Sequence, residues 1–316
     1  MPCLASWRRS SFSTRAKLNP MNPEKPPANA VLSAVIAFGL WGVLPVYWKE
    51  IGHLGSGVAL AQRVVWTLVT VVPLLVLSGE WSGFLRSLRD MRLIKAHAWS
   101  AFLLAINWGV FVWAAQHGRI IDCSLGYFIN PLLNVLIGSR LLGERLSRFQ
   151  KLSVAFAAFG VLSQLLIAGR FPWIGLLLAG SFALYGLARR RSPLGSLPGL
   201  AVETVVGIPV AVIYLIWAQQ SGMPIWGTAS AHDLLLIMGL GIITTIPLLG
   251  FAYGARQLPF AMLGVLQFLA PTGHFIVGAY VFHEPISPAS LVSFGFIWLG
   301  VLLFCSDLWL RGSARA

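Results

Sequence analysis

Two charged side chains stand inside long apolar segments and are the first candidates for chemistry in this sequence. Arg63 lies about six residues into the apolar segment 57–78, and Glu203 lies equally far into 197–218. An unpaired charge deep in an apolar helix costs about 2.5–3.5 kcal/mol on insertion scales, so it faces protein or water. We expect the pair to flank one route, with Arg63 attracting the anionic part of a small molecule and Glu203 its cationic part or a proton. The alternative is that each charge is satisfied separately near an opposite membrane face.

Prolines within apolar segments indicate further candidates. Pro131 and Pro271 each remove a helical hydrogen bond, which frees the backbone carbonyls four residues earlier, at Tyr127 and Gln267. Irregular backbone is tolerated at membrane depth only where it faces protein or a wet cavity. We therefore expect Tyr127 and Gln267 to face a cavity, and Pro131, Pro271 and Pro247 to act as kinks or hinges. A kink that only improves packing remains the alternative.

Amide and aromatic side chains complete the candidate binding residues. Asn107 and Asn130 have the groups to bind a polar solute, although hydrogen bonds between helices explain such amides equally well. Trp41, Tyr47 and Trp108 are suited to line a route for a planar or amphipathic solute. Many of the 13 tryptophans are expected instead to be interfacial anchors or core residues.

Signatures of catalysis are missing from the sequence. It contains no His-Glu-x-x-His, no Gly-x-Ser-x-Gly and no Gly-x-x-x-x-Gly-Lys-Ser/Thr motif. Glu203 is the one clear acid inside an apolar segment, so acid–base catalysis has no second carboxylate. His274, one turn from Pro271, is better explained as a packed histidine than as a proton relay. We expect no enzyme activity, no metal and no cofactor, with an intramembrane enzyme as the alternative.

The elements that must position these residues follow from the composition. Hydrophobic residues make up 57% of the 316 residues and charged residues 10%, whereas soluble domains carry about 25% charged residues. A bilayer is crossed by about 20 apolar residues in a helix. The sequence predicts an all-α membrane bundle of ten transmembrane helices, at roughly 31–49, 57–78, 98–117, 123–142, 149–168, 172–188, 197–218, 234–254, 258–281 and 288–308.

Basic residues fall in short clusters between these segments. The formal charge is +13, but clusters of this kind are topology signals and do not indicate nucleic-acid binding. With the N-terminus inside, 19 of the 23 basic residues lie on the inner side and three on the outer side. Both termini are therefore expected in the cytoplasm. Residues 1–29 are predicted to be a disordered tail, with Met21 as an alternative start of translation, and 309–316 a C-terminal tail.

The chain also resembles itself at an offset of 140 residues. Between 101–170 and 241–310, 13 of 70 positions are identical, and Arg63 and Glu203 share the same offset. A copy with an odd number of spans is followed by a copy that enters from the opposite side. The sequence thus predicts two inverted five-helix repeats, 30–168 and 172–308, an architecture typical of secondary transporters. The matched residues include Pro131 with Pro271, Gly138 with Gly278, Glu144 with Glu284 and Ser153 with Ser293.

The fifth expected helix carries two local patterns. Ser147 and Gln150 form a capping box at its start, and Glu144 just before it is expected to favour that helix N-terminus. A stripe of small residues follows, which predicts close helix packing or a homodimer face. The stripe consists of Ser153, Ala157 and Gly160.

Short motifs recur along residues 30–308. They are Trp41-Gly42 with Pro45 and Tyr47-Trp48-Lys49, Arg63-Val64-Val65-Trp66, Asn107-Trp108, Ser124 to Asn134, Glu144-Arg145, Phe182 to Gly186, Glu203-Thr204, Thr244 to Leu249 and Phe294 to Trp298. Together they resemble the drug/metabolite transporter superfamily in its EamA-type ten-helix form, and within it the RarD family. The resemblance implies multi-pass transport across the cytoplasmic membrane of a bacterium. It does not identify a substrate, because the superfamily spans amino acids, nucleotide-linked metabolites, polyamines and drugs.

The expected function is secondary transport of a small metabolite or drug-like solute. No motif encodes direction or energy coupling; export is the direction we expect, with protons as a candidate coupling ion. Membrane lipid and a second copy of the chain are further expected partners. A membrane scaffold is the second alternative, disfavoured because no long loop or soluble domain is present to carry an interaction.

The connection Gln219–Asp233 tests the predicted topology. It is the longest connection expected on the outer face, and it lacks Lys and Arg. A reporter fused within it should be active as a periplasmic reporter and inactive as a cytoplasmic one. A cytoplasmic reporter that is active there would contradict the inverted repeat.

Overall fold

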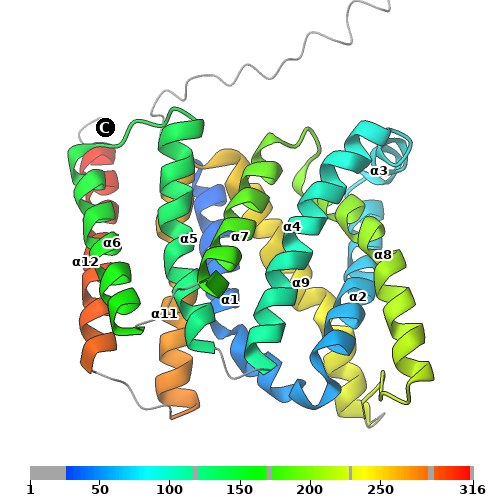
Figure 1. Cartoon of the computed structure of the whole chain (residues 1–316). Coiled ribbons are helices and arrows are strands. Elements are labelled where there is room, and N and C mark those ends of the chain that lie inside the picture. The colour runs from blue at the N-terminus through cyan, green and yellow to red at the C-terminus, as the bar shows by residue number, and fades with distance from the viewer. Residues whose placement is uncertain (1–25, 117–119, 169–172, 228–229, 284–287, 314–316) are drawn as a thin grey trace, which may run out of the picture.

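The computed structural model of the chain describes residues 26–116, 120–168, 173–227, 230–283 and 288–313. These residues form one bundle of helices, and no strand occurs among them (Figure 1). The helices are α1 (Ala28–Glu50), α2 (Ser56–Leu77), α3 (Trp81–Ser87), α4 (Met91–Gln116), α5 (Ile120–Leu141), α6 (Arg148–Ala168), α7 (Trp173–Arg191), α8 (Ser196–Gln220), α9 (Ala231–Gln257), α10 (Phe260–Leu266), α11 (Leu269–Ile276) and α12 (Pro288–Ser313), with the short turns η1 (Gly52–Leu54) and η2 (Val277–Val281).

Five helical segments are long and apolar enough to cross a membrane: α1, α2, α8, α9 and the combined segment α10–η2. The outer surface of the bundle is apolar as well. Leu77, Leu166 and Val210 are 83%, 82% and 73% exposed. Large apolar patches of this kind are unstable in water and are covered by lipid in membrane proteins. The chain is therefore a multi-pass membrane protein.

The predicted segment 258–281 is not one continuous helix, because the chain makes a turn at Gln267 and Phe268 between α10 and α11. Pro271 has no N–H to donate to the Gln267 carbonyl, which accepts instead from the Ala270 N–H at 3.2 Å. Pro131 and Pro247 lie inside α5 and α9, which continue through them. Their predicted hinge role stays a prediction.

Both described ends of the chain lie on one side of the bundle, where α1 begins and α12 ends (Figure 1). We call this the terminus side, and the other the opposite side. Residues 1–25 of the predicted tail lie outside the described residues, as do Glu284 and Ser287, and α12 continues to Ser313.

Most of the packing joins helices of the first half of the chain, α1 to α6, to helices of the second half, α7 to α12. Helix α2 packs on α8, α5 on α10 and α6 on α12. Helix α1 packs on both α9 and α11, while α7 packs on both α4 and α5. The interior of the molecule therefore lies between the two halves of the chain.

Glycines allow helices α6 and α12 to approach closely. A Cβ on Gly160 of α6 would lie 2.7 Å from the Ser293 carbonyl oxygen of α12, and a Cβ on Gly300 would lie 2.7 Å from the Ser153 carbonyl oxygen of α6. The two contacts are equivalent, because Gly160 corresponds to Gly300 and Ser153 to Ser293 at the repeat offset of 140 residues. The predicted small-residue stripe on α6 is thus used for packing within the chain.

The capping box at the start of α6 is confirmed. The Gln150 N–H donates to Ser147 Oγ at 3.0 Å, and Gln150 Oε1 accepts from the Ser147 N–H at 3.1 Å. The expectation for Glu144 was wrong about the helix. Its carboxylate accepts the N–H groups of Phe260 and Ala261, at 2.6 and 2.9 Å, and so caps α10. The turn between α5 and α6 thereby joins the two halves on the terminus side.

Substitution of the contact glycines tests the α6–α12 packing. Gly160→Ala and Gly300→Ala should each lower stability by about 1–3 kcal/mol, because the added methyl group meets backbone that cannot move aside. The measurement is the thermal unfolding midpoint of the purified protein in detergent. Gly295→Ala on α12 is the matched control, because its Cβ would meet nothing within 4 Å. Equal midpoints for the three variants would contradict the packing.

Candidate functional site

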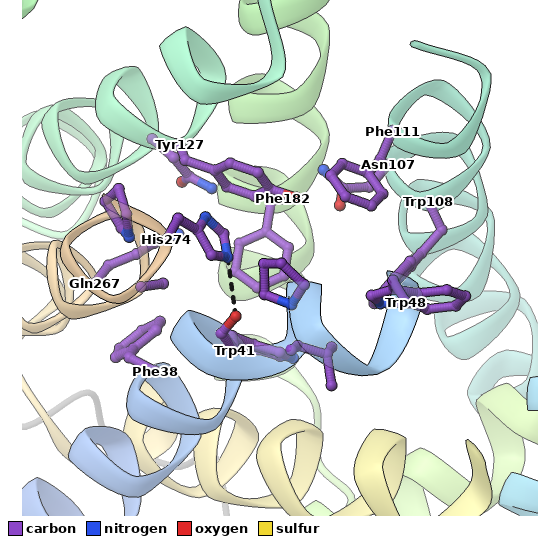
Figure 2. Close-up of a pocket in the computed structure, with 15 residues that line it drawn as sticks. Phe38, Trp41, Trp48, Asn107, Trp108, Phe111, Tyr127, Phe182, Gln267 and His274 are labelled. Carbon is purple, nitrogen blue, oxygen red and sulfur yellow. Dashed lines mark hydrogen bonds between the residues drawn. The ribbon is translucent and has the colours of Figure 1, made fainter. Parts of the chain in front are cut away.

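One pocket lies at the junction of the two halves (Figure 2). It encloses about 680 Å³ of empty space, part of which is open to the surroundings. Its walls come from α1, α4 and α5 of the first half and from α7 and the α10–α11 segment of the second. The lining residues are Phe38, Trp41, Leu44, Pro45, Trp48, Asn107, Trp108, Phe111, Tyr127, Asn130, Phe182, Gln267, Ala270, Pro271 and His274.

A proline in α1 shapes the first wall. Pro45 cannot donate to the carbonyl of Trp41, which would be left unsatisfied in an apolar interior. His274 Nε2–H of α11 donates to this oxygen at 2.9 Å, the contact drawn in Figure 2. The adjacent residues Gly42 and Gly273 bring the backbones of α1 and α11 together, since a Cβ on Gly273 would lie 2.6 Å from the Gly42 Cα. His274 therefore has the structural role that the sequence favoured.

Two polar pairs join α5 to the α10–α11 segment. The Tyr127 ring meets the His274 ring edge-on, with 5.3 Å between the ring centres. Asn134 Nδ2–H donates to Gln267 Oε1 at 2.7 Å. At the offset of 140, Tyr127 corresponds to Gln267 and Asn134 to His274, so each pair is the counterpart of the other.

The wall across the pocket is aromatic and carries two amides. Trp48 and Trp108 lie with ring centres 5.5 Å apart, and Phe111 meets Trp108 edge-on at 6.0 Å. Asn107 Nδ2–H donates to the Leu178 carbonyl at 2.8 Å and to a serine hydroxyl at 3.1 Å. The side-chain oxygen of Asn130 is buried and has no hydrogen-bond donor among the described residues. Asn107 thus links helices, whereas Asn130 keeps an acceptor for a ligand.

The pocket lies toward the opposite side, and aromatic rings close it toward the terminus side. Trp41, Phe182 and Phe251 pack with ring centres 4.9–5.8 Å apart, and Tyr185 stacks on Phe251 at 5.8 Å. Phe38 completes the layer, at 6.0 Å from Phe251. All these residues are buried or partly buried. The layer thus lies between the pocket and the Glu203 side of the interior.

Glu203 lies beyond this layer in a buried polar cluster. Its carboxylate accepts from Arg189 Nη1 at 3.3 Å, from the Tyr185 hydroxyl at 3.4 Å and from the Ser100 hydroxyl, and it lies 3.4 Å from His97 Nδ1. Arg189 is 0% exposed and Glu203 4%. Because the two charges pair directly, Glu203 is neutralised inside the protein. The cluster joins α4 of the first half to α7 and α8 of the second.

Arg63 and Tyr47 also lie outside the pocket lining. The Tyr47 hydroxyl donates to the Leu236 carbonyl of α9, which anchors α1 in the core. The Arg63 guanidinium lies over the Trp108 ring, 4.4 Å from its centre, and makes no ion pair with Glu203. Of the two charges, Arg63 contacts a residue that lines the pocket, whereas the contacts of Glu203 are with residues outside the lining. That Arg63 and Glu203 flank one route stays a prediction.

The remaining sequence candidates meet in one place. Trp41, Asn107, Trp108, Tyr127, Asn130 and Gln267 all line the pocket. The carbonyl freed by Pro45 is not among the sequence candidates, although a proline four residues after Trp41 predicts it as well as Pro131 and Pro271 predict the other two. Arg189 is not among them either, because its place close to the end of α7 is typical of a basic loop residue. Phe111 and Phe182 gave no signal, since phenylalanine is common on every face of an apolar helix.

Removal of Arg189 tests the buried ion pair. Arg189→Gln leaves the Glu203 carboxylate buried without its cation, which typically costs about 3–5 kcal/mol. We expect a large fall in the thermal unfolding midpoint in detergent. Arg191→Gln, at an exposed position two residues on, should leave the midpoint nearly unchanged. Equal midpoints for the two variants would show that the pair does not stabilise the fold.

Comparison with known proteins places this arrangement in a family. No family model matches the sequence. The chain is 39% identical to an uncharacterized transporter, YojE, of Bacillus subtilis, over 87% of the chain and 92% of that protein. It is 34% identical to protein RarD of Streptomyces exfoliatus, over 94% of each, and 37% identical to protein RarD of Escherichia coli, over 90% of the chain and 96% of that protein. A crystal structure at 19% identity shares the fold, with a TM-score of 0.67 over 89% of the chain and 98% of the other. The chain belongs to the RarD family of membrane transporters.

Proposed function

We propose that the chain is a secondary transporter that carries a small metabolite or drug-like solute through the pocket by alternating access. The observation that supports this most directly is the place of the pocket between the two halves of the chain, with walls from both. A site at such a junction becomes accessible from one membrane face and then from the other when the two halves exchange conformations. Its aromatic walls and the amide oxygen of Asn130, which has no donor among the described residues, suit an amphipathic solute.

Ten crossings in two inverted repeats form part of this proposal. Besides the five segments that are long and apolar enough, α4, α5, α6, α7 and α12 have 19 to 26 residues, enough to span a bilayer. The packing supports a two-fold relation. When each helix is replaced by its counterpart in the other half, the contact of α1 with α9 becomes that of α7 with α4, and the contact of α1 with α11 becomes that of α7 with α5.

Contacts between individual side chains also occur in equivalent pairs when each residue is replaced by its counterpart 140 residues away. The Tyr127–His274 contact corresponds to the Asn134–Gln267 contact, and the close approaches of Gly160 and Gly300 correspond to each other. The first two pairs lie beside the pocket. A two-fold axis in the membrane plane that passes near the pocket is the arrangement in which two inverted halves can exchange conformations around a fixed site.

The conformation has a direction if the termini are cytoplasmic, as the loop charges predict. In the cytoplasmic membrane of a bacterium, the terminus side then faces inward. The aromatic layer, the Glu203 cluster and the Glu144 cap on α10 close that side, and the pocket lies toward the outer face. We propose export, for which this outward-facing state is the one that releases solute. The inward-facing state requires the polar contacts across the two halves to separate.

Substitution of one wall of the pocket tests this function. Trp108→Ala should weaken solute binding and flux by at least about tenfold, because it removes an aromatic surface worth more than about 1.4 kcal/mol. The solute is first selected by a thermal-shift screen of metabolites and drugs on the purified protein. Binding is then measured by calorimetry, and flux in proteoliposomes.

Trp99→Ala is the matched control, because Trp99 lies on the same helix but is 54% exposed on the outer surface. It should bind and transport as the wild type does. Equal loss in both variants, or none in either, would contradict transport through this pocket. Flux with and without a pH gradient decides the coupling: stoichiometric proton movement indicates antiport, and flux independent of the gradient indicates facilitated diffusion.

A further inference from the structure

We propose that the solute is an amphipathic anion, a planar apolar group that carries a carboxylate or a similar acid, and that Arg63 selects it by charge. This inference rests on the proposed function, because the anion would occupy the same pocket. It differs from the expectation drawn from the sequence, in which Arg63 would attract the anionic part of the solute and Glu203 its cationic part or a proton.

Arg63 is a largely buried cation, 7% exposed, whose Nε has no hydrogen-bond acceptor among the described residues. In the part of the chain that the structure describes, the side chain makes no hydrogen bond or ion pair; the guanidinium lies over the face of the Trp108 ring, 4.4 Å from the ring centre, and Tyr185 is a further electrostatic neighbour. A buried cation without an anion is costly, so its presence indicates a site that an anion completes.

Two further donors without acceptors lie near this charge. The indole N–H groups of Trp48 and Trp66 are buried and have no acceptor among the described residues. Trp66 follows Arg63 by one turn of α2, and Trp48 lies 5.5 Å from Trp108 in the pocket wall. Both indoles pack against the same core cluster, which includes Ile237 and Leu240 of α9. Unsatisfied donors of this kind suit a ligand that offers only acceptors, as a carboxylate does.

Among the described residues, no carboxylate forms an ion pair with Arg63. The pocket lining contains no acidic residue. Glu203 is paired with Arg189 at 3.3 Å, Glu144 caps α10, and Asp233 lies 3.0 Å from His53. In the described part of the chain, Arg63 therefore has no carboxylate partner, and its positive charge lies against the face of Trp108, a residue of the pocket wall. In a medium of low polarity, such a charge changes the affinity for an ion roughly tenfold or more.

Three probes with the same ring and different charge test this selection. They are 1-naphthylacetate, the neutral 1-naphthylacetamide and the cationic 2-(1-naphthyl)ethylamine, titrated by calorimetry into the purified protein in an uncharged detergent. We expect the acetate to bind about tenfold more tightly than the amide, and the amine to bind most weakly. Arg63→Gln should reduce the affinity for the acetate to that for the amide, and Arg63→Lys should keep most of the preference.

Lys49→Gln is the control for a general effect of positive charge. Lys49 lies at the end of α1 with its ammonium 4.2 Å from the centre of the Phe282 ring, and its loss should leave the preference for the acetate unchanged. If Arg63→Gln does not fold, the order of affinities in the wild type and in Arg63→Lys carries the test. Phosphatidylglycerol added to the micelles distinguishes a lipid from a soluble solute. If this lipid displaces the acetate, the anion that Arg63 and the two indoles bind is a lipid headgroup.

The failure of this inference differs from the failure of the transport function. Equal affinity for the three probes, a preference for the amine, binding of none of them, or displacement by the lipid overturns the selection of a soluble anion. If the amide or the amine binds and Trp108→Ala abolishes its binding and flux, the transport function stands while the anion is excluded. If a solute is transported equally by wild type and Trp108→Ala, the pocket itself is not the route.

Discussion

Inside a bilayer, a polar group can find partners only within the protein, and the rest of this structure depends on that constraint. Pro45 leaves the Trp41 carbonyl without a donor, and His274 of the other half supplies one. Asn107 of α4 is satisfied by the Leu178 carbonyl of α7, and Glu203 by Arg189 and its neighbours. Each solution reaches across helices, and the first two lie in the pocket wall. The hydrogen bonds that make these residues tolerable in lipid are also those that hold the pocket walls in place.

The two halves are joined by contacts of two physical kinds. Between α6 and α12, Gly160 and Gly300 allow backbone to meet backbone, and such packing gains by dispersion without polar groups to exchange. On the terminus side, the Glu144 carboxylate at the start of α10 and the Glu203 cluster join the halves through charge. If the halves separate on the terminus side, water can form hydrogen bonds with the polar groups that lose their partners. If α6 and α12 separate, nothing replaces the dispersion energy of their close packing. A carrier that opens toward the terminus side would therefore keep the α6–α12 pair and break the polar contacts.

Residues of the pocket could be predicted where the local sequence imposes a physical requirement on them. Tyr127 and Gln267 were chosen because a proline follows each by four residues, and both line it. Glu144 was assigned to the wrong helix, because a carboxylate near a helix start gives no information about other helix starts close in space. Arg189 was counted as a loop charge, because the sequence cannot show that a basic residue near a helix end bends inward to a buried acid.

The sequence by itself determined that this chain is an all-helical membrane protein, because only lipid can cover a chain with 57% hydrophobic and 10% charged residues. It also determined the matched positions at the offset of 140, since a repeat is a property of the order of residues. The tertiary structure decided which charges are paired. Arg63 and Glu203 are equivalent in the sequence, yet one lies unpaired beside an indole and the other is neutralised by Arg189. That difference depends on which helices meet, and side chains far apart in the chain determine the local charge only once the helices have packed.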